Sequence, residues 1–322
     1  MSTITISEAV RRAIEQAMKK DPTVFLAGED VGKLGGAFGC SRGLQEEFGK
    51  NRCMETPISE TAIIGLGVGA ALAGMRPIVE LMYMDFMGVC MDEIMNQAAK
   101  MRYMFGGKAK VPMVMRMTAG ATIRAAAQHS QSLEAMLCHI PGLKVVYPST
   151  PQDAYSLVTA AIEDDNPVVC IEHKAMYSMT GEVDENKRVP IGCADVLVEG
   201  KDATVVAWGL MARRAEEAAA ILKKDGINIE VIDPRTLVPL DKEVIYRSVK
   251  KTNRLVIVQE AVLTGGYASE ISACVAENCV EYLDAPIVRV TAPDTPVPYS
   301  PVLEDAFVPN VDKIVAAVKS VL

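Results

Sequence analysis

Apolar and polar residues follow two alternating periods along the 322-residue chain. Short runs rich in β-branched residues predict strands, and stretches with apolar residues three or four positions apart predict helices. In the first half of the chain the predicted strands are 23–30, 76–82, 111–117, 143–148 and 166–173, and the predicted helices are about 7–18, 89–104, 130–138 and 151–164. Strands separated by helices are typical of a mostly parallel sheet covered by helices, so the pattern predicts an α/β fold.

The periodic pattern lapses between Tyr177 and Gly200, where the sequence is polar and rich in turn-forming residues. It then resumes with strands predicted at 203–209, 228–233, 254–260 and 286–290 and helices at 211–225, 241–252, 266–279 and 311–321. We therefore predict two parallel-sheet α/β domains, residues 1–180 and 201–322, joined by a linker at 181–200.

Composition narrows the possible partners. The net charge is −8 and no basic block is present, which disfavours nucleic acid and anionic membranes as partners. The longest apolar run, Thr61–Met75, has 15 residues, whereas a membrane-spanning helix needs about 20. The N-terminus lacks the apolar segment of a signal peptide, and the eight cysteines show no CxxC spacing, so we expect reduced thiols in a cytoplasmic protein.

The glycine-rich segment 58–74 supports more than one interpretation. Gly65, Gly67 and Ala70 mimic a dinucleotide-binding GxGxxA motif with Glu80 as the ribose-binding acid, although Glu80 follows Gly65 by 15 residues instead of about 20. Alternatively, Ser59 caps a helix that starts at Glu60, and the small residues allow this helix to pack closely on a neighbouring backbone.

A third interpretation concerns the position of Glu60 on the first turn of an apolar helix. Desolvation raises the pKa of a carboxylic acid. An acid that stays protonated at neutral pH can hydrogen-bond a ring nitrogen, which is what a thiamine-dependent enzyme requires. On the residues of this segment alone, all three interpretations stay open.

Several long segments together resemble one protein family. They are METPISETAIIGLGVGAALAGMRPIVELMYMDF, NQAAKMRYMFGG, AAQHSQSLEA, HIPGLKVVYPSTPQDA, IDPRTLVPLD and VTAPDTPVPYSP. The chain resembles the beta subunits of the thiamine-diphosphate-dependent first components of 2-oxo acid dehydrogenases, including the pyruvate and acetoin dehydrogenases, and it is more similar to the acetoin branch. The resemblance implies a pyrimidine-binding domain followed by a transketolase-type C-terminal domain. The implied activity is cleavage of acetoin, or decarboxylation of pyruvate, with transfer of the two-carbon unit to a lipoyl group.

The resemblance also implies partners. In the family a separate alpha chain carries a GDG motif that holds the cofactor's diphosphate through magnesium, and this sequence contains no GDG. An α2β2 assembly is therefore expected. A lipoyl-bearing dihydrolipoyl acyltransferase core is expected to dock near residues 311–322.

The resemblance assigns roles to four side chains. Glu60 occupies the position of the catalytic glutamate, which shares its proton with the aminopyrimidine ring so that the cofactor can generate its own carbanion. Phe86 matches the aromatic residue that packs on the pyrimidine, and Met82 lies on the same predicted wall. His129, in QHSQ, is expected to donate a proton during transfer to the lipoyl group. Simple core packing stays an alternative for Phe86 and Met82.

Some family members bind potassium through backbone carbonyls in a region that matches AAIEDDNP. Carried over, the ligands are Met113, Ala161, Ile162, Asp164 and Asn166, although an ordinary helix-ending turn explains the same residues.

Two departures from the pattern of the pyruvate branch count against pyruvate as the substrate. Val89 stands where a glutamine is common, and residues 122–127 replace a glycine-rich loop. We expect His139 to be structural and leave the role of His173 open. The rival functions are a nicotinamide-dependent oxidoreductase that uses Gly65, Gly67 and Ala70, and an inert scaffold subunit.

Overall fold

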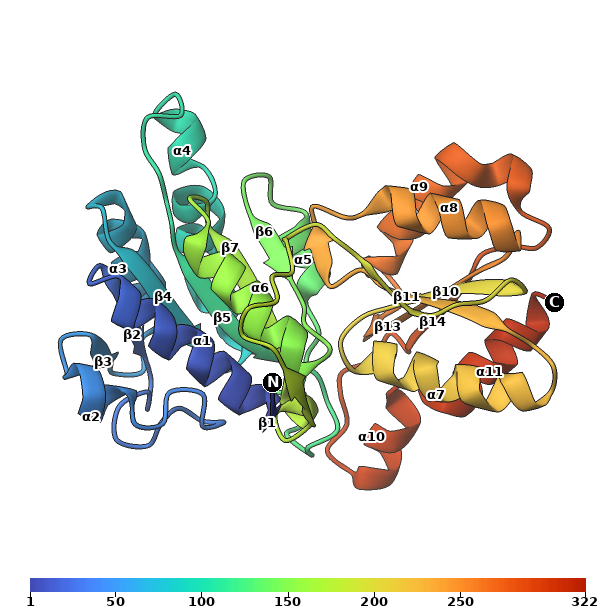
Figure 1. Ribbon diagram of the computed structural model, residues 1–322, viewed down its shortest axis with the longest axis horizontal. Coiled ribbons are helices and arrows are strands. Elements are labelled where there is room, and N and C mark those ends of the chain that lie inside the picture. Colours follow the sequence, from blue (N-terminus) through green and yellow to red (C-terminus); the bar gives the residue numbers. More distant parts are fainter. The chain divides into compact units, whose positions relative to one another are not determined.

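The computed structural model describes residues 1–322 and divides into two compact units (Figure 1). Unit 1 comprises residues 1–119 and 136–191, and unit 2 comprises residues 120–135 and 192–322. Each unit is built on a mainly parallel sheet with helices, which confirms the predicted α/β class.

The sheet of unit 1 contains strands in the order β3 (Cys53–Glu55), β2 (Val24–Gly28), β4 (Arg76–Leu81), β5 (Val114–Ala119), β7 (Val168–His173) and β6 (Lys144–Val146), all parallel. The central strands read as near-continuous apolar runs because parallel sheets are covered on both faces. A separate antiparallel pair joins β1 (Ser2–Thr5) to β8 (Thr180–Val183).

Helices α1 (Ile6–Lys20) and α6 (Pro151–Glu163) pack side by side in unit 1 (Figure 1). Each starts at a threonine cap: the Thr5 side chain accepts a hydrogen bond from the Glu8 N–H, and the Thr150 side chain accepts one from the Asp153 N–H. Helix α1 thus begins at Ile6, one residue before the predicted range 7–18. Four further α-helices lie between α1 and α6 in the sequence: α2 (Leu44–Phe48), α3 (Glu60–Leu72), α4 (Met101–Met104) and α5 (Glu134–Cys138).

Two predicted helices are wrong in their geometry. The segment predicted at 89–104 forms a 3-10 helix η1 (Met84–Cys90), a π-helical turn η2 (Glu93–Ala98) and the short α4. The buried residues of η1 are Met84, Met87 and Cys90, and this spacing of three matches the 3-10 repeat. The segment predicted at 130–138 is helical only over α5, because the polar residues of QHSQS favour irregular backbone.

In unit 2 the strand order is β14 (Val288–Ala292), β13 (Leu255–Val262), β10 (Ala203–Ala207), β11 (Ile229–Asp233) and β9 (Asp195–Val198). Only β9, at the edge, is antiparallel to its neighbour. Helices α7 (Leu210–Lys224) and α11 (Val311–Ser320) pack together on one face, and α8 (Lys242–Thr252) and α9 (Ala268–Cys279) on the other (Figure 1). The remaining elements of unit 2 are β12 (Thr236–Val238), η4 (Val280–Tyr282) and α10 (Pro301–Phe307), whereas η3 (Lys174–Met176) follows β7 in unit 1.

Two further observations bear on the composition of the chain. All eight cysteines are free thiols. None of the helices combines the length and the apolar character that crossing a membrane requires.

Two glycines of α3 provide a matched test of how closely this helix packs on the sheet. A Cβ at Gly67 would lie 2.8 Å from Met113 Cε and 3.0 Å from Val79 Cγ1, whereas a Cβ at Gly69 meets nothing within 4 Å. Both substitutions to alanine gain about 0.5–1 kcal/mol of helix propensity. We expect Gly69→Ala to raise the free energy of unfolding by that amount and Gly67→Ala to lower it by about 1–3 kcal/mol through overpacking. Chemical denaturation of the two variants measures both changes, and equal effects would contradict close packing at Gly67.

Candidate active site

Two polar side chains and the predicted Met82 lie where parallel strands of unit 1 end. Glu29 follows β2, Met82 follows β4, and His173 ends β7. The carboxyl ends of parallel strands lie at one edge of a sheet, which is where α/β proteins usually bind ligands. The residues predicted to bind the cofactor are therefore expected at this edge.

Glu60 is the first residue of α3 and is only 9% exposed. Its position at the helix N-terminus places the carboxyl group at the positive end of the helix dipole. Ser59 occupies the cap position as predicted, but its side chain makes no capping hydrogen bond.

Phe86 lies in η1, which packs directly against α3. Thr61, next to Glu60, donates a hydrogen bond from its hydroxyl to the Val89 carbonyl at 3.0 Å, so the start of α3 is fixed to η1. The Thr118 hydroxyl donates to the Met82 carbonyl and fixes the end of β4 to β5. The structure thus places Glu60 and Phe86 on two elements that pack directly against each other.

A chain of aromatic rings connects Phe86 to the loop after β2. The ring of Tyr83 meets Phe86 edge-on at 5.7 Å between centroids and Phe38 edge-on at 6.3 Å. Phe38 stacks on Tyr177 at 4.8 Å, and the buried Lys174 places its ammonium group 5.2 Å from the Tyr83 ring centre. Such contacts orient the rings as well as burying them.

Beneath these rings, a buried charge cluster joins three neighbouring strands. The guanidinium of Arg116 on β5 forms a bidentate pair with Glu172 on β7, at 2.8 and 2.6 Å, and a third contact with Glu80 on β4. The Tyr177 hydroxyl donates to Glu172 at 2.7 Å. Burial raises the pKa of Glu80, while Arg116 lowers it. Burial lowers the pKa of Arg116, but the two carboxylates outweigh burial and the pKa is raised well above its usual value.

Neither this charge cluster nor Glu29, the acid whose pKa Glu60 influences, was predicted from the sequence. Burial raises the pKa of Glu29, and the next largest cause is the charge of Glu60. The available signal was a charged residue inside or directly after an otherwise apolar strand, as in RPIVEL and TVFLAGED.

The three histidines lie in different surroundings. His129 is half-buried in unit 2, and its backbone N–H donates to the Ala126 carbonyl at 3.5 Å. His173 is buried at the end of β7, where its Nδ1 accepts a hydrogen bond from the Ala175 N–H at 3.2 Å. His139 is exposed in the turn after α5.

The loop that leads to His129 has an unusual backbone. Thr122, Arg124 and Ala126 have φ values of 78°, 62° and 60°, a region that only glycine adopts without cost. Such conformations cost about 1–3 kcal/mol each and persist only where surrounding contacts impose them. One such contact is the hydrogen bond from the Ala121 N–H to the buried carboxylate of Glu260, at 2.6 Å.

The carbonyl oxygens expected to bind potassium surround the end of α6. The guanidinium of Arg76 donates to the carbonyls of Ile162 and Asp164, at 3.0 and 3.1 Å. The Met113 carbonyl accepts from the Val168 N–H at 3.0 Å, and the Ala161 carbonyl accepts from the Asp164 N–H at 3.3 Å.

This donor set has the chemistry that a hard monovalent cation prefers, because it consists of backbone oxygens. Each carbonyl oxygen has two lone pairs, so one hydrogen bond leaves room for a metal contact. The residues therefore fit potassium, which would share two of its oxygens with the guanidinium of Arg76.

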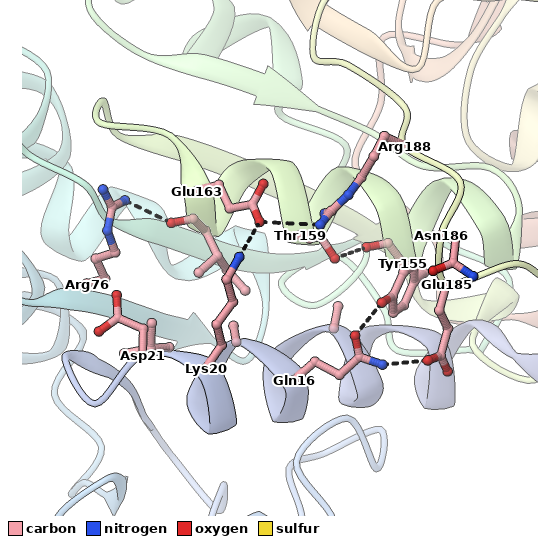
Figure 2. A pocket seen from close by; sticks show the side chains of 14 residues that line it. Gln16, Lys20, Asp21, Arg76, Tyr155, Thr159, Glu163, Glu185, Asn186 and Arg188 are labelled. Atoms are coloured by element: carbon pink, nitrogen blue, oxygen red, sulfur yellow. Dashed lines mark hydrogen bonds and ion pairs between the residues drawn. The ribbon is translucent and has the colours of Figure 1, made fainter.

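A groove of about 400 Å³ lies between α1 and α6 (Figure 2). Gln16 connects its walls by accepting from the Tyr155 hydroxyl and donating to Glu185, both at 2.6 Å. Lys20 and Arg188 approach Glu163 at 3.7 and 3.5 Å. None of Glu60, Met82, Phe86 and His129 lines this groove, so it is separate from the candidate active site.

Comparisons with known proteins agree with this geometry. Residues 2–180 match the transketolase pyrimidine-binding domain, and residues 192–314 match the transketolase C-terminal domain. The beta subunit of acetoin:2,6-dichlorophenolindophenol oxidoreductase of Bacillus subtilis (strain 168) is 50% identical over 99% of this chain and 97% of the relative. The pyruvate dehydrogenase E1 beta subunit of Rickettsia felis is 44% identical over 99% of this chain and 98% of the relative.

The chain belongs to this family of dehydrogenase beta subunits. A solved split-gene transketolase, described as an inactive beta4 tetramer, has the same fold, with a TM-score of 0.81 and 26% identity over 99% of this chain and 98% of its own. The resemblance stated from the sequence motifs is therefore confirmed for the family and the fold.

Membership of the beta-subunit family goes against the nicotinamide alternative, and the structure gives the reason. Gly65, Gly67 and Ala70 lie inside α3, whereas a pyrophosphate binds at a helix N-terminus. Glu80, the expected ribose acid, is buried and paired with Arg116. The close-packing interpretation holds for Gly67, which faces Val79 and Met113.

Removing the guanidinium tests the buried charge cluster. We expect Arg116→Met to lower the free energy of unfolding by about 3–5 kcal/mol at pH 8, because two carboxylates stay buried without a counter-charge. The loss is expected to be smaller at pH 5: without Arg116 the pKa of Glu80 rises further, and protonation then removes the buried charge. The control is Arg188→Met, which removes a pair with Glu163 whose side chains are 56% and 51% exposed and should change stability by less than about 1 kcal/mol. Equal losses at both pH values would contradict the assignment.

Proposed function

We propose that this chain is the beta subunit of the first component of an acetoin dehydrogenase complex. Together with an alpha chain it carries out thiamine-diphosphate-dependent cleavage of acetoin and transfer of the two-carbon unit to a lipoyl group. The single observation that carries the catalytic part is the carboxyl group of Glu60, buried at the N-terminus of α3 and fixed against the element that bears Phe86. Acetoin is preferred to pyruvate because a 50%-identical relative carries acetoin in its name, while the pyruvate relative is 44% identical.

In this proposal each residue of the chain has a physical task at the cofactor. When bound, thiamine diphosphate supplies a carbon nucleophile that also accepts the electrons of the cleaved bond. Glu60 holds a proton at the nitrogen of the pyrimidine ring, Phe86 packs on the face of that ring, and Met82 forms the adjoining wall. The packing of α3 on η1 keeps the carboxyl group and the aromatic ring in a fixed relation.

His129 is proposed to act in the later half of the reaction. Its imidazole is a proton-donating group, and it would donate a proton to the lipoyl sulfur that leaves when the disulfide is opened. Half-burial in a polar QHSQ loop suits this role better than that of a core histidine.

An alpha chain is proposed to supply the diphosphate and magnesium site. Helix α3 is apolar around its whole circumference, which is typical of a buried helix. Yet Leu66 is 41% exposed, Ile58 just before the helix is 82% exposed, and Val89, whose carbonyl is hydrogen-bonded to Thr61 of α3, is 63% exposed. A partner that covers this face explains the pattern. The lipoyl-bearing acyltransferase core is proposed to dock near residues 311–322.

The proposed function is tested by purifying the tagged chain with its alpha partner and comparing acetoin with pyruvate in a dichlorophenolindophenol reduction assay. We expect Glu60→Gln to assemble normally and to lose at least about 100-fold in turnover, because glutamine cannot transfer the proton. The control Glu47→Gln alters an exposed carboxylate on α2 and should behave as wild type. Wild-type turnover in Glu60→Gln would refute the catalytic role, and an inactive wild-type complex would favour the scaffold alternative.

Potassium binding is proposed at the carbonyls of Met113, Ala161, Ile162, Asp164 and Asn166. Replacing sodium by potassium at constant ionic strength should then raise the melting temperature, because a ligand that binds only the folded state stabilises it. Differential scanning calorimetry across a potassium titration measures the shift. An unchanged melting temperature would mean that the guanidinium of Arg76 alone satisfies these oxygens.

A further inference from the structure

The left-handed residues of the loop before His129 alternate with ordinary ones, and Arg124 is the middle one of the three. Because none of the three is glycine, the chain does not adopt this shape by local preference. Something outside the loop must impose it. The contacts of Arg124 identify what does so.

Arg124 is held to α10 through both its backbone and its side chain. Its N–H donates to Glu304 Oε2 at 3.3 Å, and its guanidinium donates to the same oxygen at 2.5 Å. The guanidinium also donates to the Pro301 carbonyl at 3.1 Å and pairs with Asp305 at 2.8 Å. A planar cation that pairs with two different carboxylates, together with a backbone contact from the same residue, fixes both position and orientation.

Glu304 is an unusual anchor because its side chain is fully buried. Its other oxygen, Oε1, has no hydrogen-bond partner, so Arg124 provides the ionic partner of a buried carboxylate. A buried charge of this kind has few alternative arrangements, since moving the arginine leaves it unpaired. The loop is thereby held in one conformation.

From these contacts we infer that Arg124 and Glu304 form a clamp that positions His129 for proton donation in the lipoyl-transfer step. The clamp fixes Arg124. Two residues later, the Ala126 carbonyl accepts a hydrogen bond from the backbone N–H of His129, and this bond sets the start of the QHSQ turn. Glu260 holds the other end of the loop at Ala121. Arg124 is a positioning residue, and its role rests on the proposed function of His129.

The test uses the assembled enzyme with its alpha chain and two assays. One measures acetoin-dependent dye reduction, and the other measures transfer to a lipoylated domain. We expect Arg124→Met to lower the ratio of lipoyl transfer to dye reduction about tenfold, because a displaced proton donor slows only the step that uses it. Arg124→Lys should recover part of the ratio, since lysine can pair with Glu304 but lacks the planar fork. Arg188→Met, which removes an exposed pair in unit 1, should leave the ratio unchanged.

A double-mutant cycle completes the test. If Arg124 acts through His129, the ratio in Arg124→Met/His129→Ala equals that in His129→Ala alone. A parallel loss of both assays in Arg124→Met, or additive losses in the double variant, would overturn the clamp. An unchanged ratio in His129→Ala would instead refute the proposed role of His129, so the two failures are distinguishable.

Discussion

The guanidinium of Arg116 is the interaction on which the candidate active site of unit 1 depends. It lies between Glu80 and Glu172, so one buried cation connects three adjacent parallel strands. Removing one partner of such an arrangement lowers the free energy of unfolding by more than the intact arrangement contributes to it, because each remaining charge is left in a medium of low polarity. Strands β4, β5 and β7, which lead to the candidate site, are therefore held in a single register.

The same cluster reaches the surface of the site through aromatic rings. Glu172 accepts the hydroxyl of Tyr177, Tyr177 stacks on Phe38, and Phe38 meets Tyr83, whose ring contacts Phe86. Each contact restricts the orientation of the next ring, because edge-on and stacked geometries are favoured over others. The orientation of the Phe86 ring, proposed to pack on the pyrimidine, is thus coupled to the buried core of the sheet.

Hydrophobic periodicity was sufficient to predict both sheets and most helices, because buried parallel strands and amphipathic helices leave distinct patterns. It failed at η1 and η2, where the 3-10 and π geometries depend on how Met84, Met87 and Cys90 pack. Glu60 could be singled out because an acid at the start of an apolar helix is visible in the sequence. The pairing of Arg116 with Glu80 could not be predicted in this way, because it depends on the tertiary fold. The same holds for Arg124 and Glu304, which are 180 positions apart in the sequence.

The two proposed catalytic groups are held by different physical means. Glu60 sits on the first turn of a long apolar helix, where backbone hydrogen bonds and packing fix it without strain. His129 sits on an irregular loop whose left-handed residues need an external anchor. A group that stays in place during proton sharing with a bound cofactor suits the rigid helix, whereas a group that meets an arriving lipoyl arm suits a loop. The clamp at Glu304 then limits how far that loop can move, which combines access for the arm with a defined proton donor.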